Sequence, residues 1–361
     1  MDKLKELSIG AKLVLMTVVL VLVAILATSI IGYSLSRSAI ERNIFNQLGM
    51  ARQLRASEIE GFFKQQQSLL SVLAGDVLTI ETIDSSTYSN VHAKYHPMLR
   101  NIMQKNGWRD LYIVDTSADT VIYSVEKRID FGTSLENGPF KDSGLAKAYH
   151  LAKNAKQGVV SMADFESYIP ADGAQALFMA TPIYFENSLK GVIIIQITSD
   201  EINRVMTGEQ KWASIGFGNS GETYLIGSNG TLRSETRTMI EDKKSYLSFL
   251  AAQGVDAKTT RQIEMFNYGI GLHSINTNSA QLATKGQKGE AIVKGYQNDD
   301  VFSSYGKLDI PGLDWYIICE ISLAEAMEPA HNLRNAFIFS SLLIALIASA
   351  VLHLFSSRVI V

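Results

Sequence analysis

The sequence has one cysteine in 361 residues, so no disulfide can form within a chain. Cys319 stands in the apolar run WYIICEI, where we expect a buried core thiol. The net charge of −3 excludes the basic surface typical of nucleic-acid binding. Metal-binding Cys/His clusters, a P-loop, a G-x-S-x-G motif and paired catalytic carboxylates are also missing. We therefore expect no enzyme, no cofactor and no nucleic-acid partner.

Histidine is scarce and scattered, with six residues in the chain. His92 and His96 are four residues apart on an expected helix, which is a spacing compatible with a metal ion. Two ligands are too few to define a site, so we predict no metal centre.

Two runs of 20 residues contain no Asp, Glu, Lys or Arg. They cover residues 13–32 (LVLMTVVLVLVAILATSIIG) and 336–355 (AFIFSSLLIALIASAVLHLF). A helix of this length spans about 30 Å, the thickness of the hydrocarbon core of a bilayer. We therefore predict transmembrane helices at 13–33 and 335–355, and a membrane as one partner of the chain.

Basic residues indicate the orientation of these helices. Lys3, Lys5 and Lys12 precede the first run and Arg358 follows the second, although Arg37 on the other flank weakens the signal. The first run is longer than the apolar part of a signal peptide and has no small-residue cleavage site after it. We predict that residues 1–12 and 356–361 are cytoplasmic and that the large middle region lies outside.

A weak internal repeat organises the middle region. A hairpin at 111–124 (LYIVDTSADTVIYS) has the same form as one at 222–234 (ETYLIGSNGTLRS), whose Asn229-Gly230 is typical of a type I′ turn. Each hairpin precedes three strand-like segments and a helix start, with Ser199 or Ser322 as the expected N-cap. These segments are 158–165, 176–184 and 191–198 in the first copy, and 289–296, 301–308 and 314–321 in the second. The fold class is therefore α+β, with two tandem five-stranded antiparallel modules at 85–208 and 209–330.

Residues 34–84 connect the first span to the first module. Over 34–75, apolar side chains recur every three or four residues, which predicts a long amphipathic helix that rises from the membrane. Its apolar stripe either packs only on its own domain or also forms a dimer contact. The stripe comprises Ile44, Leu48, Ala51, Leu54, Ile59, Phe62, Phe63, Leu69, Leu70 and Leu73.

This order of elements resembles the double Cache sensor regions of bacterial transmembrane receptors, with two PAS-like modules on a long helix between two spans. The local wording is similar in the segments YHPMLR (95–100), WRDLY (108–112), DFGTSL (130–135), GPFKDSGLA (138–146), GETYL (221–225) and IPGLDW (310–315). The final SRVIV (357–361) is similar to the start of a HAMP linker. The resemblance implies a homodimeric sensor of the bacterial inner membrane, cut before its cytoplasmic signalling domain. Chemotaxis receptors are the best match, with histidine kinases and nucleotide cyclases as alternatives.

The resemblance also implies a small organic ligand in the membrane-distal module. Members that bind amino acids carry Arg-x-Trp-Tyr for the ligand carboxylate and an Asp, in the strand before the last helix, for its ammonium group. This sequence has no Arg-x-Trp-Tyr, and Gln196 stands where that Asp would be. Recognition of a free α-amino acid is therefore not expected from the motif.

Ten residues of the distal module are candidate ligand contacts, and each also has a structural reading. Gln196 is polar within an apolar strand, so its amide needs a partner, either a ligand or the backbone. A basic pair in the loop could hold a carboxylate or be solvated, and the aromatic side chains could line a pocket or form plain core. Asp164 could contact the ligand or cap a turn. In the second module, we expect Arg233 to pair with Glu235 or Glu222. The ten candidates are Tyr112, Tyr123, Lys127, Arg128, Asp130, Phe131, Asp164, Tyr168, Phe178 and Gln196.

Three classes of function remain from the sequence. The chain is the sensory part of a receptor, a free-standing membrane-anchored binding protein, or an extracytoplasmic enzyme. The last class lacks any nucleophile–base signature. Sensing of a small molecule and transmembrane signalling is therefore the predicted function.

Overall fold

The structure is a computed structural model that describes residues 9–76, 88–210, 212 and 217–359. It divides into two compact units. One unit comprises Met1–Gln47 and Ser322–Val361, and the other comprises Leu48–Ile321. The last residues of the predicted long helix, 77–84, lie outside the described part of the chain.

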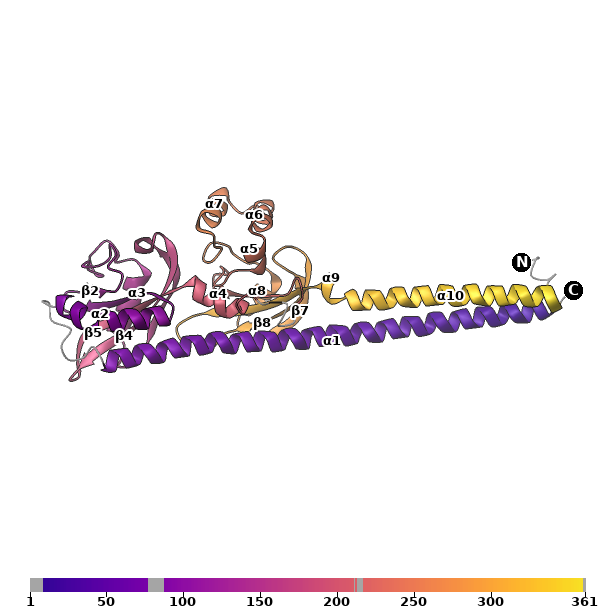
Figure 1. The fold of residues 1–361 in the computed structure, drawn as a ribbon, viewed down its shortest axis with the longest axis horizontal. Helices are drawn as coiled ribbons and strands as arrows, with labels where there is room; N and C mark the ends of the chain where they lie inside the picture. The colour runs from indigo at the N-terminus through magenta and orange to yellow at the C-terminus, as the bar shows by residue number, and fades with distance from the viewer. Residues whose placement is uncertain (1–8, 77–87, 211, 213–216, 360–361) are drawn as a thin grey trace. The chain divides into compact units, whose positions relative to one another are not determined.

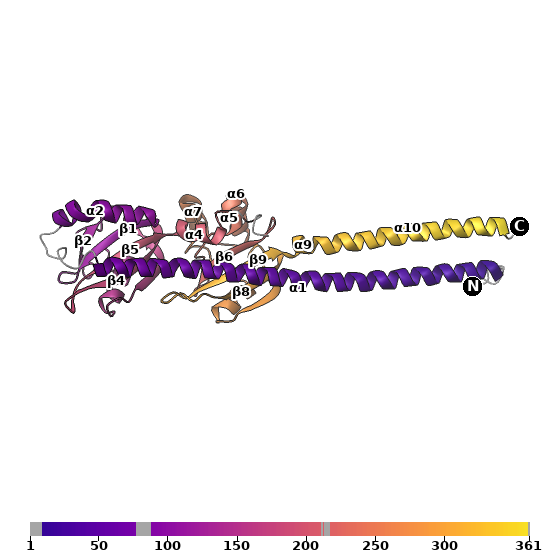
Figure 2. The same cartoon turned by 60° about the horizontal axis from the view of Figure 1, so that its bottom comes forward.

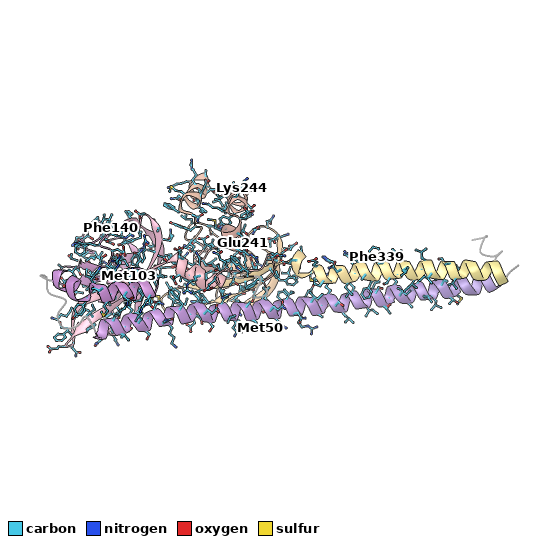
Figure 3. The ribbon with its side chains drawn as sticks, viewed as in Figure 1. Met50, Met103, Phe140, Glu241, Lys244 and Phe339 are labelled. Atoms are coloured by element: carbon cyan, nitrogen blue, oxygen red, sulfur yellow. The ribbon has the colours of Figure 1, made fainter. Side chains whose placement is uncertain are left out.

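The first unit contains the two apolar helices. Helix α1 (Ile9–Asp76) is continuous, and helix α10 (Glu328–Val359) follows the short helix α9 (Leu323–Ala326). Both helices contain an exposed apolar stretch long enough to cross a membrane. A Cβ added at Gly32 would lie 3.3 Å from the Phe337 ring, so the glycine allows α1 and α10 to approach closely. The exposed Phe339 on α10 points away from α1 (Figure 3).

The second unit begins with the distal module, whose sheet has five antiparallel strands in the order β2-β1-β5-β4-β3. Helix α2 (Tyr88–Lys105) precedes the hairpin of β1 (Trp108–Asp115) and β2 (Thr120–Ser124). Helix α3 (Gly144–Lys153) then leads to β3 (Ser161–Tyr168), the one-turn η2 (Ile169–Ala171), β4 (Ala174–Phe185), β5 (Ser188–Thr198) and helix α4 (Ser199–Thr207) (Figure 1). The predicted strands are present, although Thr198 rather than Ser199 occupies the N-cap of α4.

Side chains that alternate along β5 divide the distal module into two layers. Ile193, Ile195 and Ile197 join a core with residues of α1 and α2, including Phe63 and Leu99. On the opposite face, residues of the sheet pack against the buried side of α3. We call this second side the inner face, and it is the side on which the candidate site lies.

The proximal module has a four-stranded sheet in the order β6-β9-β8-β7. Its strands are β6 (Glu222–Gly227), β7 (Gly289–Lys294), β8 (Asp300–Lys307) and β9 (Trp315–Ser322). Helix α1 runs along this sheet as well (Figure 2), and Leu225 and Ile317 join the same core as Phe63. One helix is therefore the spine of both modules.

The second strand of the predicted proximal hairpin is not formed, so the prediction of five strands was wrong for this module. Thr231 and Leu232 make isolated bridges only, to Ser274 and Ile226. The Ser234 hydroxyl accepts the hydrogen bond of Leu225 N, where a strand would offer a carbonyl. The turn is not type I′ either, because Gly230 has a positive φ of 75° and Asn229 does not.

The inner face of the proximal sheet is covered by helices that the sequence analysis did not predict. They are α5 (Arg237–Glu241), α6 (Lys243–Ala252), α7 (Ala257–Phe266) and α8 (Asn278–Thr284). In Figure 1, α5, α6 and α7 lie on the side of the sheet away from α1. Their buried side chains form a third core with Tyr224, Tyr316 and Ile318. This face is therefore filled by the protein itself.

Candidate functional site

The inner face of the distal sheet holds a group of polar side chains, which we call the distal cluster: Asp110, Tyr112, Asp130, Tyr168 and Gln196. None of the five is more than 1% exposed. Asp110 is paired with Gln196 across β1 and β5. Tyr112 shares this face because side chains two apart point to the same side of a strand. Burial of so many polar groups is costly unless they are bonded, so their partners define what the site can do.

Two tyrosine hydroxyls connect the cluster. Tyr112 donates a hydrogen bond to Gln196 Oε1 at 3.1 Å, and Tyr168 donates one to Asp130 Oδ2 at 2.5 Å. The Phe178 ring, opposite Gln196 in the register of β4 and β5, meets the Tyr168 ring edge to face at 4.9 Å. Burial, followed by nearby carboxylate charge, raises the pKa of both tyrosines. Both therefore remain hydrogen-bond donors at physiological pH.

Asp110 fixes the loop that carries Asp130. Its Oδ1 accepts from the backbone N–H groups of Leu111, Val125 and Glu126 at 2.7, 3.0 and 3.2 Å. Its Oδ2 accepts from the Ser124 hydroxyl at 2.8 Å. Burial raises the pKa of Asp110 to about 6, and the Asp130 charge contributes in the same direction. Asp110, from β1, thus holds the start of this loop in place.

Two buried polar atoms, one in the distal cluster and one in the adjoining loop, have no hydrogen-bond partner among the described residues. They are Asp130 Oδ1 and Arg128 Nε. The other end of the Arg128 guanidinium donates to Pro170 O at 3.0 Å and lies 3.7 Å from Asp172 Oδ2. One unpaired acceptor and one unpaired donor therefore stand two residues apart on the same loop.

The structure brings together five of the predicted contacts, namely Tyr112, Asp130, Tyr168, Phe178 and Gln196, with Arg128 in the adjoining loop. Lys127 and Phe131 lie on the more exposed part of that loop. The Lys127 ammonium group is 4.9 Å from the centre of the Phe131 ring. This cation–π contact is compatible with a role at the rim of the site.

Two predicted contacts lie elsewhere. Tyr123 faces the opposite side of the sheet, where His96 Nδ1 is 3.0 Å from its hydroxyl. Asp164 accepts hydrogen bonds from Arg233 at 2.8 to 3.0 Å and from Trp315 Nε1 at 2.9 Å. Asp164 therefore joins the two modules, and the predicted pairing of Arg233 with Glu235 or Glu222 was wrong.

Asp110 received no role in the sequence analysis, although the sequence carried a usable signal. It is an acidic residue near the start of a strand that continues with the apolar run at 111–114. The hydrogen bonds that it accepts involve residues up to 16 positions away, so its partners follow only from the structure.

A separate cavity of about 530 Å³ lies where α4 meets the proximal module. Its lining mixes acidic, basic and amide side chains, and Glu235 at its wall accepts hydrogen bonds from the backbone N–H groups of Gly269 and Ile270. The lining residues are Asp200, Asn203, Arg204, Thr207, Glu209, Gln210, Glu235, Met239, Ile240, Lys243 and Asn267.

Within the part of the chain that the structure describes, no three His, Cys, Asp or Glu side chains are grouped for a metal ion. The sequence has His92 and His96 at a spacing compatible with a metal ion, but the His92 side chain lies outside the described part of the structure.

Comparisons with known proteins agree on one fold. A sequence model of Cache domains (dCache_1) matches residues 34–330. The ligand-binding domain of the Pseudomonas aeruginosa amino acid chemoreceptor PctB, solved with L-Arg, is similar with a TM-score of 0.51 at 15% identity. That match covers 86% of this chain and 99% of the PctB domain. No curated protein sequence matches the chain.

Two further solved structures are similar. The sensory domain of the Campylobacter jejuni chemoreceptor Tlp3 gives a TM-score of 0.54 at 11% identity, over 82% of this chain and 100% of that one. The sensor domain of the Vibrio cholerae histidine kinase DctB gives 0.51 at 12% identity, over 78% and 98%. At these identities the likeness concerns the fold.

Proposed function

The chain belongs to the Cache domain family, and we propose that it senses a small polar organic molecule through the distal cluster. Cache domains are extracytoplasmic ligand-binding sensors of signalling receptors, and they are not catalytic. The finer assignment of the ligand site to Asp110, Tyr112, Asp130, Tyr168 and Gln196 is our proposal. The single observation that carries it is the unpaired pair of buried atoms, Asp130 Oδ1 and Arg128 Nε.

These two atoms limit the chemistry of the ligand. A buried carboxylate oxygen needs an N–H or O–H donor, and a buried guanidinium N–H needs an acceptor. A ligand with both groups would satisfy the loop in one step, with charge-assisted hydrogen bonds on both sides. We therefore propose a ligand that carries a donor, such as an amine or hydroxyl, and an acceptor, such as a carboxylate or carbonyl.

PctB gives a starting point for this search, because its ligand-binding domain was solved with L-Arg. The present chain differs at positions expected for α-amino acid recognition, since it has Gln196 in place of an Asp and lacks Arg-x-Trp-Tyr. Gln196 supplies no negative charge for an ammonium group. Asp130 is the remaining candidate to bind an ammonium group. We therefore favour amines and hydroxy compounds whose shape differs from that of an α-amino acid.

Ligand binding must rearrange the inner face, because the distal cluster is closed to solvent in this structure. Gln196 stands three residues before Ser199, where β5 continues into α4. At the end of α4, Val205 O accepts a hydrogen bond from Arg55 of α1 at 3.2 Å. A ligand that binds one arrangement of this chain of contacts better than another would shift the position of α1.

We further propose that the receptor is a homodimer in the bacterial inner membrane. Apolar side chains of α1 remain exposed on one stripe, with Met50 64%, Leu54 56% and Val72 53% exposed. Met50 points away from both modules (Figure 3). Gly61 and Gly75 have no atom within 4 Å of an added Cβ, which leaves room for a second helix. The stripe is therefore a suitable contact with a second copy.

The output domain follows from neither the fold nor the site. A chemoreceptor is the first candidate, while the likeness to the DctB sensor domain keeps a histidine kinase open. A nucleotide cyclase, or a binding protein with no output domain, are the remaining alternatives. The coding sequence after Val361 decides among them.

The experiment is a thermal-shift screen of the full chain in lipid nanodiscs, with L-arginine first and then other amino acids, amines, organic acids and purines. A compound at 100 times its Kd raises the free energy of unfolding by about 2.7 kcal/mol. The replacements Gln196→Ala and Asp130→Ala should each weaken binding of a compound found in this way by about 1–3 kcal/mol.

Tyr112→Phe and Tyr123→Phe form a matched pair of controls, because both tyrosines are fully buried on neighbouring strands. Only Tyr112→Phe should weaken the ligand, since Tyr123 lies on the opposite face. Equal affinity in Gln196→Ala, Asp130→Ala and the parent would move the site away from the distal cluster.

A further inference from the structure

The proximal module repeats the arrangement of the distal cluster with one chemical change. Gln196 stands three residues before α4, and Glu320 stands three residues before α9. Tyr112 donates to Gln196 at 3.1 Å, and Tyr224 donates to Glu320 Oε2 at 3.0 Å. In the distal sheet the residue opposite Gln196 is Asp110, and the residue opposite Glu320 is Glu222. The distal pair thus has one carboxyl group and the proximal pair has two.

The two proximal glutamates are buried side by side. Glu222 is 6% exposed and Glu320 is 3% exposed. Direct cross-strand partners in an antiparallel pair have Cβ atoms about 4.5–5.5 Å apart, a distance at which like charges repel. Ser303 donates to Glu320 Oε1 at 3.0 Å, and the backbone N–H of Arg237 donates to Glu222 Oε2 at 2.9 Å.

No charged side chain among the described residues is bonded to either carboxyl group. The Arg237 guanidinium donates to Gly218 O and Gly221 O at 3.1 and 2.9 Å and pairs with Glu241 at 2.9 Å. It lies 5.0 Å from the centre of the Trp212 ring. Its charge therefore acts on Glu222 only over a longer distance.

The other groups around the pair come from the remaining elements of the module. Tyr296, after β7, acts on Glu222 through its hydroxyl, and the charge of Asp299, in the β7–β8 turn, opposes ionisation of both glutamates. On the opposite face of the sheet, Arg52 of α1 donates to Ser304 at 3.0 Å. Among the described residues named here, the two cations are Arg52 and Arg237, and both are bonded to other partners.

We propose that Glu222 and Glu320 form a pH-responsive switch that couples the proximal module to the second membrane span. When both carboxyl groups are protonated, the pair is neutral and the β6–β9 contact is stable. When both ionise, two charges lie side by side in a buried site and favour local opening of β9. The proton would be a second input, independent of the ligand proposed for the distal cluster.

The electrostatics agree with this geometry. Burial raises the pKa of Glu222 to about 7 and that of Glu320 to about 8, and the Glu222 charge adds to the shift of Glu320. An acid whose pKa is raised by folding binds its proton more tightly in the folded state. Its stabilisation is complete below the unfolded pKa, near 4.5, and is lost as the pH rises through about 7 to 8.

The position of Glu320 connects the switch to the output. It lies two residues before Ser322, the N-cap of α9, and the chain then enters α10. Opening of the end of β9 therefore frees the residues before α9 from the proximal sheet, and the chain continues from there into the span.

The test uses the full chain in nanodiscs between pH 5.5 and 9.5. Infrared difference spectra report protonated carboxyl groups directly, and hydrogen exchange of residues 315–326, corrected for the intrinsic rate at each pH, reports opening. The parent should lose a protonated carboxyl signal, and protection of β9 should fall at least about tenfold, the change that one pKa unit represents. The double replacement of Glu222→Gln and Glu320→Gln should abolish the fall in β9 protection. It should reduce the loss of protonated carboxyl signal to the part that Asp110 and Glu235 contribute.

Glu235→Gln is the matched control, because Glu235 is a buried glutamate of the same module with a pKa raised to about 7 by burial. Its carboxylate accepts from the backbone N–H groups of Gly269 and Ile270, and it lies outside the β6–β9 pair. This variant should keep the response of β9. An equal fall in β9 protection in the double variant overturns the proposal. Unchanged β9 protection in the parent across the pH range also overturns it, and this result decides even if a variant fails to fold.

Discussion

The two modules share one plan but use their inner faces differently. The distal inner face is covered by α3 and leaves Asp130 Oδ1 and Arg128 Nε without partners among the described residues. The proximal inner face is covered by α5 to α8, and its two central carboxyl groups are bonded to tyrosine, serine and backbone donors. The two sheets thus share a corresponding pair of strands, β1 with β5 and β6 with β9. The cover and a few polar residues set whether a face suits a ligand or a proton.

The largest expected effect concerns the core that the two modules share along α1. Trp315 of β9 is fully buried, stacks on Phe165 of β3 at 5.9 Å and meets Phe63 of α1 at 5.4 Å. Trp315→Ala should lower the free energy of unfolding by about 3–5 kcal/mol. Hydrogen exchange should show loss of protection in β3 as well as in β9.

Trp108 provides a matched indole within the distal module, where it donates to Gln66 of α1 at 2.7 Å. Trp108→Ala should lower the hydrogen-exchange protection of β1 and α1 more than that of the proximal sheet. If Trp315→Ala leaves β3 fully protected, the modules are independent and the shared core along α1 does not couple them.

The carboxyl group of Asp110 makes the stability of the distal module depend on pH. Because burial raises its pKa to about 6 from about 4, its contribution to stability is complete below pH 4 and is lost as the pH rises through 6. Two pKa units correspond to at most about 3 kcal/mol. Asp110→Asn should therefore flatten the pH dependence of unfolding between pH 4 and 7, as measured by denaturant titration at each pH. A slope equal to that of the parent would show that Asp110 does not titrate in this range.

Gln196→Glu converts the distal pair into a copy of the proximal one. A second carboxyl group opposite Asp110 should destabilise the distal module by about 1–3 kcal/mol at neutral pH, and more as the pH rises, because neither charge gains a cation. Thermal unfolding at several pH values measures this. The effect should shrink in an Asp110→Asn background, and an unchanged effect there would mean that the two side chains do not interact.

The sequence was sufficient for the two apolar helices, the long helix and the distal strands, because the signals for these elements are local. The apolar runs, the long helical stripe and the alternation in β5 each depend on residues close together in the chain. The prediction of the proximal hairpin was wrong because side chains take up the bonds of its second strand. The Ser234 hydroxyl accepts from Leu225 N, and Arg233 pairs with Asp164 of the other module. Propensity could not reveal either contact.

The site was only partly predictable for a related reason. Tyr112 and Tyr123 look equivalent in the sequence, but Ile113 is the partner of Tyr123 across the hairpin, so the two tyrosines face opposite sides. The pairing follows from a register that shifts at Ile113 and Val114. The partners of Asp164 could not be predicted, because Arg233 and Trp315 lie 69 and 151 residues away.

The smallest expected effect concerns the surface that neither module uses. Met50 and Leu54 are exposed on α1, so Met50→Ser and Leu54→Ser should each change the free energy of unfolding of one copy by less than about 0.5 kcal/mol. They should nevertheless weaken association, because a stripe of apolar and small residues is where a second α1 would pack.

Cysteines placed one at a time along residues 48–72, in a Cys319→Ala background, should crosslink with a helical period that peaks at 50, 54, 61, 68 and 72. Arg52 and Ile59 are buried against the modules and supply the internal control, since cysteines there should crosslink poorly. A flat profile would mean that α1 is a spine for the two sheets only, and that a dimer, if it forms, uses another surface.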